Sequence, residues 1–515
     1  MLFHSYEFLF LFLPITWGVY ATLLRFGSVR TAFSWLTLAS LTFYGWWNPH
    51  LLPLILTSLI VNYGIARAIQ GRSGTRTANS LLVAGLAFNI GLIGYFKYAG
   101  LMVLTVNEIA GTAFAIPKIV LPLAISFFTF VEIGFLVEAW RGNLRVPSFM
   151  RYSLFVTFFP HLIAGPIVNH TDLLPQLVRD RIRISSTGLA MGLSLFAIGL
   201  FKKVVLADHV STYFQAAYAA VSSGVALTLI PAWIAMTDAA MQIYFDYSGY
   251  SDMALGLALL FGIRLPLNFY SPFKATSIPE FWRRWNMTLM RFLRDYSYIP
   301  FGGNRHGWFR QAFAILLTML ICGLWHGAGV NDALWGLSIG LLLLASVTWN
   351  RYFPHLVKSP PGFASRIARR ALVFAGFVLP LAIFMFPNIS HGLGVCASML
   401  GLDGIVMPSR YQSAMGPAGQ ALARAGVEFR SSMPVGIGND QIFWTLACLL
   451  TVYALPNCQQ LFGRFRPSML PNKIAMQPAK FRWRPTIAWA LSLSGLFVAS
   501  LLFMTRVKEF FYFQF

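Results

Sequence analysis

The amino-acid sequence predicts an all-α polytopic membrane protein, and its composition is the first reason. Of its 515 residues, 57% are hydrophobic and only 11% are charged, and its mean hydropathy is +0.64. A soluble domain carries about 25% charged residues, because charged side chains cover the surface that faces water. The composition therefore excludes a soluble globular enzyme. It also excludes a disordered chain, because so apolar a chain does not stay solvated.

Long apolar stretches recur along the whole chain and are the second reason. A helix needs about 20 mostly apolar residues to cross a bilayer, and we expect about 11–13 such helices. The stretches that suit them are 8–24, 32–47, 51–69, 80–96, 119–140, 188–206, 225–245, 312–330, 333–350, 371–388, 441–457 and 485–504. Shorter apolar stretches, expected to be re-entrant or tilted, lie at 98–116, 153–168, 253–263 and 392–402.

The placement of basic residues is the third reason, and it predicts an orientation. Lysine and arginine number 39 against 17 acidic residues, which gives a formal net charge of +22. Basic residues collect in the short loops that stay cytoplasmic, so this excess does not indicate nucleic-acid binding. We expect the cytoplasmic loops at 25–30, 67–76, 141–151, 351–370 and 464–484. The Gly/Ser/Pro-rich loop 404–440 and both termini then lie outside.

The segment 264–310 is too polar to cross the membrane and too aromatic to be a free loop. It contains eight basic residues against two acidic ones. Apolar residues recur at helical spacing within it, among them Phe281, Trp282 and Trp285. Ser277 and Glu280 have the spacing of a capping box. We therefore expect amphipathic helices that lie in the cytoplasmic interface.

Three positions in or near the apolar segments could carry chemistry. His326 lies deep in the apolar run MLICGLWHGAGVNDALWG, and an imidazole can act as a base and as an acid near pH 7. Asn286 lies on the aromatic amphipathic segment, where its amide could hold a carbonyl group. Arg283 and Arg284 could bind the phosphates of a nucleotide-bearing donor. The alternatives are a hydrogen-bonded core histidine, a surface or capping amide, and ordinary cytoplasmic anchoring.

Other polar residues favour structural roles. Asp246 and Asp252 lie in the apolar stretch MQIYFDYSGYSDMALG, and buried acids must pair. We expect an ion-pair network with nearby arginines such as Arg264 or Arg283. Gly165 and Pro166 should interrupt a helix at the membrane edge. The four cysteines show neither a disulfide framework nor metal-ligand spacing, so we expect buried thiols and no metal site.

Several sequence blocks together resemble one known family. The blocks are WRRWN followed by LWHG, QIYFDYSGYSDMALGLALLFGIRLPLNF, LRDYSYIPFGGNRHG and FPHLIAGPI. They are similar to the membrane-bound O-acyltransferase (MBOAT) family, and to its bacterial polysaccharide-acetylating branch in particular. The resemblance runs over about residues 1–350 and returns at the carboxy terminus. It implies one membrane-embedded acyltransferase domain over 1–515, with 1–350 as the family core and 351–515 as carboxy-terminal helices.

The resemblance assigns roles to single residues. The invariant histidine of the family matches His326, and its second polar position matches Asn286. Alginate-type and D-alanyl-transferring relatives usually have histidine at that second position, whereas many eukaryotic members have asparagine. This difference argues against alginate itself as the substrate and makes cellulose acetylation an alternative.

The terminal hexapeptide Phe510–Phe515 resembles an F-x-Y-F-x-F motif of such bacterial proteins. The resemblance implies that Tyr512 is a transient acyl carrier on the outer side of the membrane. The alternative is an aromatic anchor at the interface. The carrier role is the prediction that we retain.

The resemblance also implies a reaction and its partners. We expect acetyl-CoA as the cytoplasmic donor, with Arg283 and Arg284 near its phosphates, His326 as base and Asn286 beside the thioester carbonyl. A periplasmic SGNH-type acetyltransferase or acyl-accepting subunit would receive the acetyl group for an exopolysaccharide, next to a polysaccharide synthase and export complex. The chain would lie in the bacterial inner membrane.

Other classes of membrane protein are less well supported. A transporter or polymer-export channel also explains many spans, but it predicts repeated halves and mid-span acids, which the sequence lacks apart from Asp246 and Asp252. A non-catalytic scaffold would not require His326. The motifs of serine hydrolases, P-loop ATPases and zinc proteases are absent from the sequence.

Overall fold

The computed structural model describes residues 1–117, 119–354, 362–431, 438–469 and 481–504. Within these residues nearly all regular structure is helical, and two strands of four residues each are the exception. Seven helical segments in this part of the chain are long and apolar enough to cross a membrane. The prediction of an all-α polytopic membrane protein is confirmed.

The seven segments include four that are built from consecutive helical elements. The first is η1 (Phe8–Phe12) with α1 (Leu13–Phe26), and the second is η2 (Pro49–Leu51) with α3 (Leu52–Ile69). The third joins α4 (Arg76–Ile93), the π-helix η3 (Gly94–Tyr98) and α5 (Ala99–Ala110), and the fourth joins α10 (Ser186–Phe201), the π-helix η4 (Lys202–Ala207) and α11 (Asp208–Ser222). The other three are α15 (Gly307–His326), α16 (Val330–Tyr352) and α18 (Phe363–Met385).

Several predicted apolar stretches form helices that are shorter than the roughly 20 residues that usually cross a bilayer. These helices have 16 or 17 residues: α2 (Val29–Gly45), α6 (Ile125–Trp140), α22 (Asn439–Ala454) and α24 (Ile487–Phe503). Helix α6 begins late because Ala124 has a left-handed backbone, which breaks the stretch 119–140. The expected stretches 225–245 and 253–263 belong to one helix of 32 residues, α12 (Leu229–Leu260).

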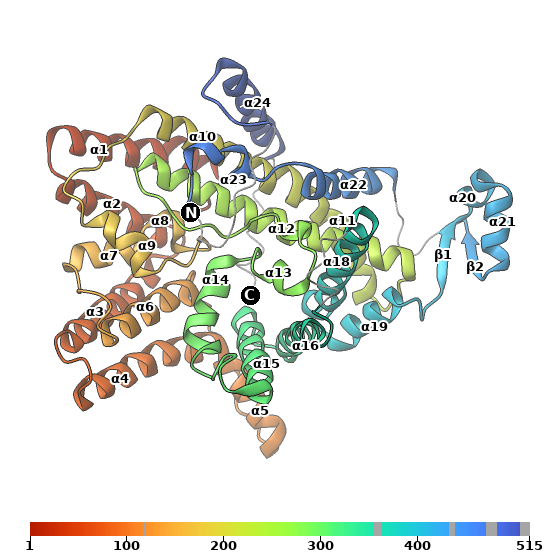
Figure 1. Cartoon of the computed structure of the whole chain (residues 1–515), viewed down its shortest axis with the longest axis horizontal. Coiled ribbons are helices and arrows are strands. Elements are labelled where there is room, and N and C mark those ends of the chain that lie inside the picture. Colours follow the sequence, from red (N-terminus) through yellow and green to blue (C-terminus); the bar gives the residue numbers. More distant parts are fainter. Residues whose placement is uncertain (118, 355–361, 432–437, 470–480, 505–515) are drawn as a thin grey trace.

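Helix α12 runs through the middle of the molecule and is buried along nearly its whole length (Figure 1). It crosses α10 at two pairs of glycines, Gly192 with Gly256 and Gly199 with Gly249. A Cβ atom on Gly199 would lie only 2.5 Å from the carbonyl oxygen of Gly249. Small residues of this kind let helix backbones touch inside a membrane.

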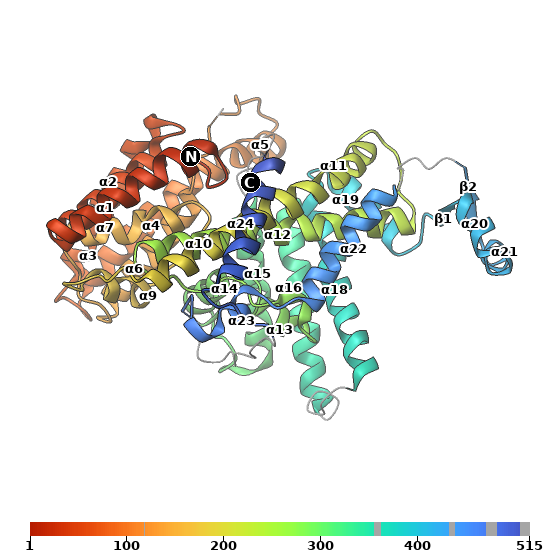
Figure 2. The same ribbon diagram turned by 90° about the horizontal axis from the view of Figure 1, so that it is seen from above.

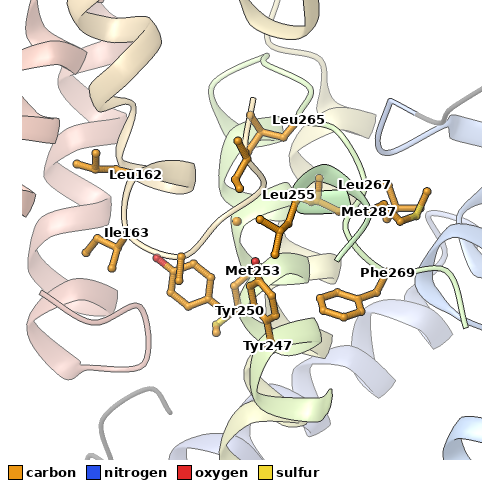
Figure 3. Close-up of a cluster of buried hydrophobic side chains, with 14 of the residues drawn as sticks. Leu162, Ile163, Tyr247, Tyr250, Met253, Leu255, Leu265, Leu267, Phe269 and Met287 are labelled. Atoms are coloured by element: carbon orange, nitrogen blue, oxygen red, sulfur yellow. The ribbon is translucent and has the colours of Figure 1, made fainter. Parts of the chain in front are cut away.

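The amino-terminal helices form one side of the molecule, on the left in Figure 1. They are followed by three short helices, α7 (Phe149–Thr157), α8 (Phe159–Leu162) and α9 (His170–Leu177). No helix forms between Leu162 and His170, so Gly165 and Pro166 interrupt the helical structure as predicted. Figure 3 shows Leu162 and Ile163 beside Tyr250 of α12, with Tyr247 and Phe269 further to the right.

The segment expected as an outer loop, 404–440, has more structure than the sequence suggested. After α19 (Ile389–Met399) come β1 (Ile405–Pro408), α20 (Ser409–Met415), α21 (Pro417–Arg424) and β2 (Val427–Arg430). The two strands pair in parallel, with Ile405 opposite Val427. This unit projects from the helical bundle (Figure 2). Small elements such as α23 (Cys458–Leu461) and η7 (Gly463–Phe465) follow later in the chain.

The aromatic segment 264–310 differs from the prediction in three ways. It contains only short helices: η5 (Pro272–Lys274), α13 (Ile278–Trp282), α14 (Met287–Leu293) and the π-helix η6 (Arg294–Tyr298). Ser277 caps α13 as expected, but the Glu280 carboxylate accepts from Thr276 N instead of closing a capping box. Phe281 and Trp285 are buried inside the protein. The apolar face of this segment therefore packs on other helices and does not lie free in the interface.

Candidate functional site

His326 is the last residue of α15, and α15 and α16 form a tight helical hairpin. The backbones of the two helices touch at Gly323 and Gly336: a Cβ atom on Gly323 would lie 2.9 Å from Gly336 Cα. The turn 327–329 joins the two helices directly after His326. The hairpin therefore fixes the histidine at its tip, and the residue is only 7% exposed.

Aromatic rings surround the imidazole of His326. The ring centroids of Trp325, Trp335 and Phe384 lie 4.6, 5.2 and 5.7 Å from its centroid, each in an edge-on arrangement. These rings come from α15, α16 and α18. The indole N–H groups of Trp325 and Trp335 are buried and have no hydrogen-bond partner among the described residues. An apolar wall with two available donors suits the binding of a polar group.

Asn286 is held by its backbone at the beginning of α14. It has a left-handed conformation, with φ of 41° and ψ of 55°, which asparagine tolerates better than most residues. Its carbonyl side-chain oxygen Oδ1 accepts a hydrogen bond of 3.2 Å from the Tyr247 hydroxyl. Its Nδ2 group is buried without a partner in the described part of the chain. The amide is thus oriented by one bond and keeps its donor available.

Two chains of ring contacts connect the aromatic segment around Asn286 to the rings beside His326. On one side, Trp285 contacts Phe377, which contacts Trp282, and Trp282 contacts Trp335 beside the histidine. On the other side, Phe292 stacks on Phe130 at 4.2 Å, and Phe130 stacks on Trp325. A series of ring contacts therefore links Trp285, the neighbour of Asn286, to the rings around His326, which lies 40 positions later in the sequence.

A small cavity lies along α14 beside the second ring chain. Its lining includes Phe130 and Phe292, and also the polar side chains of His170, Thr288 and Arg291. Arg291 forms an ion pair with Asp172, and burial lowers the pKa of His170 from its ordinary value. This cavity places charged groups next to the rings that lead to His326.

The two predicted phosphate-binding arginines have different surroundings. Arg283 is exposed, and its Nε donates to the carbonyl oxygen of Pro279. Arg284 forms an ion pair of 2.5 Å with Glu280. Lys274 lies near both Arg284 and Arg370: burial lowers the pKa of Lys274, and the charges of Arg370 and Arg284 lower it further. The group of basic side chains near the predicted arginine pair is therefore larger than the sequence analysis predicted. Its added members, Lys274 and Arg370, come from other elements.

The buried acids of α12 form ion pairs, but not with the arginines that were expected. Lys202 Nζ lies 2.6 Å from Asp252, and Lys203 Nζ lies 2.7 Å from Asp246. Both lysines belong to the π-helix η4, which packs on α12. The prediction of a structural ion-pair network is confirmed, and the prediction of Arg264 or Arg283 as partners is wrong. Two adjacent lysines in an apolar segment were the signal that could have identified them.

The remaining predicted positions fall into two groups. The four cysteines are free, and Cys322, Cys448 and Cys458 are buried. Tyr512 and the rest of the terminal hexapeptide lie outside the described residues, so the acyl-carrier role stays a prediction.

The sequence analysis did not single out Lys97 and Tyr98, which contact the end of the helix that carries His326.

Together, the fold and the site define a polytopic membrane protein with a buried histidine and a buried, oriented amide in one aromatic interior. Comparison with known proteins identifies the class. Residues 114–389 match the membrane-bound O-acyltransferase (MBOAT) family. The chain belongs to this family and is an acyltransferase.

The chain is similar to several named bacterial transferases and acetylases. The chain is 37% identical over 433 residues to the peptidoglycan O-acetyltransferase of Helicobacter pylori. This match covers 79% of this chain and 81% of that protein. It is 38% identical over 350 residues to the probable alginate O-acetylase AlgI of Pseudomonas aeruginosa, over 67% of this chain and 65% of that protein. It is 28% identical over 250 residues to the teichoic acid D-alanyltransferase of Bacillus subtilis, over 45% and 62%.

Proposed function

We propose that the protein transfers an acetyl group from cytoplasmic acetyl-CoA across the inner membrane for O-acetylation of an envelope polysaccharide. The observation that carries this proposal is that His326 and Asn286 are both buried, that the Asn286 amide keeps an available donor among the described residues, and that ring contacts link their surroundings. The names of its relatives, a peptidoglycan O-acetyltransferase and alginate O-acetylases, support acetyl as the group and a polysaccharide as the final acceptor.

The chemistry requires one base and one hydrogen-bond donor. His326 removes the proton from an acceptor hydroxyl as the oxygen attacks the thioester carbonyl carbon. The carbonyl oxygen becomes negatively charged, and Asn286 Nδ2 donates to it. The carbon–sulfur bond then breaks, and the proton held by His326 passes to the departing thiolate. The products are an acetyl ester and free CoA, so His326 returns to its starting state.

The donor binds from the cytoplasmic side. The cations Lys274, Arg284 and Arg370 provide positive charge for its phosphates, together with the exposed Arg283. We place the thioester arm beside Phe130 and Phe292, whose ring contacts lead to Trp325 and His326. Phosphate recognition by clustered cations is common in proteins.

The acetyl group is accepted on the periplasmic side of the membrane, first by protein and finally by the glycan. The acetyl group passes to Tyr512 or directly to a periplasmic acetyltransferase of the SGNH type, which modifies the polymer. Both termini then lie in the periplasm. The relatives favour peptidoglycan or alginate as the polymer, and asparagine rather than histidine at position 286 keeps a cellulose-type glycan as an alternative.

Mass spectrometry after incubation with deuterated acetyl-CoA tests the reaction. We expect the wild-type protein to release CoA and to carry a labelled acetyl group on its terminal peptide. His326→Ala should lower turnover by about 10²–10⁴-fold, the usual contribution of a general base. Tyr512→Phe should lose the label on the terminal peptide.

Two outcomes separate the parts of this proposal. CoA release without an adduct, in the presence of the periplasmic partner, means direct transfer and removes Tyr512 from the mechanism. His326→Ala with wild-type turnover at equal expression means that the base is assigned wrongly.

A further inference from the structure

The carboxy-terminal end of α15 leaves backbone carbonyl groups that need hydrogen-bond donors from elsewhere in the protein. The last four carbonyl groups of a helix have no partner within it, and an unpaired carbonyl in an apolar interior is costly. Gly327 N donates to the carbonyl oxygen of Gly323. The carbonyl groups of the next three residues, which end with His326, still require donors.

Two consecutive residues from a distant helix supply these donors. The Lys97 ammonium group donates to the carbonyl oxygen of His326 at 2.9 Å and also to that of Trp325. The Tyr98 hydroxyl donates to the carbonyl oxygen of Leu324. Three successive carbonyl groups at the end of α15 are thereby satisfied by residues that are more than 220 positions away in sequence.

The position of Lys97 and Tyr98 is unusual for their segment. They lie in the π-helix η3 (Gly94–Tyr98), between α4 and α5. Single π-turns within longer helices are rare and occur often at functional sites. The segment Arg76–Ala110 is otherwise poorly buried, and Tyr95 in the same π-helix is 60% exposed. Lys97 and Tyr98 instead reach inward, to a helix end where a positive charge also interacts favourably with the helix dipole.

The other side of the turn is fixed as well. Asp332 Oδ2 accepts a hydrogen bond of 2.9 Å from Gly329 N, which caps the beginning of α16. A Cβ atom on Gly327 would lie 2.1 Å from the same carboxylate oxygen, so a larger residue there would displace the Asp332 side chain. The turn that follows His326 is thus held by Asp332 on one side and by Lys97 and Tyr98 on the other.

We propose that Lys97 and Tyr98 are positioning residues that hold His326 for acyl transfer. They touch the backbone of α15 and act through it on the placement of the imidazole. The activity part of this inference rests on the proposed function. A displacement of about 1 Å in a reacting group can lower a rate about 10²-fold, so loss of the Lys97 bonds should appear in turnover more than in donor binding.

The test compares four variants in purified membranes. Lys97→Met should lower kcat about 10²-fold while leaving KM for acetyl-CoA within about twofold. Lys97→Arg, which can still donate to two carbonyl groups, should recover most of kcat. Tyr98→Phe removes one hydrogen bond and should have a smaller effect in the same direction. Tyr95→Phe, in the same π-helix but exposed, is the matched control and should behave as wild type.

A second readout does not depend on the donor. The rate at which diethyl pyrocarbonate modifies His326, followed by peptide mass spectrometry, reports on how tightly the helix end is held. We expect faster modification in Lys97→Met than in wild type and an unchanged rate in Tyr95→Phe. If Lys97→Met does not accumulate as folded protein, the same measurements on Tyr98→Phe and Lys97→Arg test the positioning role in its place.

The outcomes separate this inference from the proposed function. If wild type shows no turnover with acetyl-CoA but Lys97→Met accelerates the modification of His326, the proposed donor is wrong and the positioning role stands. If wild type is active and Lys97→Met keeps both its kcat and its modification rate, the positioning role is wrong. A lower melting temperature with unchanged kcat per folded molecule would make the contact merely structural and would also overturn it.

Discussion

Asn286 combines a strained backbone with an oriented amide. Its left-handed conformation divides the aromatic segment into α13 and α14. Glycine would adopt the same conformation without strain, but it would not supply an amide. The unpartnered Nδ2 group in the described structure indicates that asparagine is there for its side chain.

Substitution of Asn286 by glycine therefore removes the amide while it keeps the left-handed backbone conformation. Asn286→Gly should fold normally and lower kcat by about 10²–10³-fold, the usual effect of losing one donor to a developing oxyanion. Arg466→Gly is the matched control, because Arg466 is exposed and has a similar φ of 48°. Steady-state kinetics with acetyl-CoA provide the measurement. Equal rates for Asn286→Gly and wild type would remove Asn286 from the mechanism.

At the scale of elements, the hairpin of α15 and α16 depends on direct backbone contact. A Cβ atom on Gly336 would lie 2.3 Å from the carbonyl oxygen of Met319 and 3.0 Å from Gly323 Cα. Because backbone atoms cannot move aside as a flexible side chain can, any side chain at this position must separate the helices. Separation would also shift His326 at the tip.

The expected result of Gly336→Ala is a loss of stability of about 1–3 kcal/mol, the range for overpacking. Gly495→Ala in α24 is the control, because nothing lies within 4 Å of a Cβ atom at that position. Thermal unfolding in detergent, followed by the reaction of buried Cys322 with a thiol dye, measures the difference. An unchanged melting temperature for Gly336→Ala would show that the hairpin adapts.

At the scale of the whole molecule, α12 is the element that joins the other parts. It contacts α10, α11, α18, α19 and α22, and it contributes Tyr247 to the contact with Asn286. The ion pair of Lys203 with Asp246 lies within this junction, and the two side chains are 3% and 2% exposed. Lys203 also pairs with Asp208 of α11. Loss of the Lys203 ion pairs would therefore disturb the packing of several helices at once.

Removal of one partner should therefore destabilise the entire fold. Lys203→Met should lower stability by about 3–5 kcal/mol, because it leaves a buried carboxylate without its cation. The double variant Lys203→Met with Asp246→Leu should recover part of the loss. Arg430→Gln, which breaks an exposed pair with Glu428, should change stability by less than about 1 kcal/mol. Melting temperatures in detergent decide, and a wild-type value for Lys203→Met would contradict the role of this pair.

The amino-acid sequence by itself determined the class of the protein and its principal catalytic candidate. Hydropathy and charge are local properties, so they indicate membrane helices without knowledge of the fold. His326 was recognisable because an ionisable residue is rare in an apolar run. The break at Gly165 and Pro166 was also local. The number of long spans was less predictable, because helix ends depend on backbone breaks such as Ala124.

Only the tertiary structure decided which distant residues meet. Lys97 and His326, Lys203 and Asp246, and Tyr247 and Asn286 are pairs separated by tens to hundreds of positions. Their contacts follow from how whole helices cross, which is set by glycine contacts and ring packing rather than by neighbours in sequence. For the same reason the sequence suggested arginine partners for Asp246 and Asp252, whereas the fold placed two lysines of η4 against them.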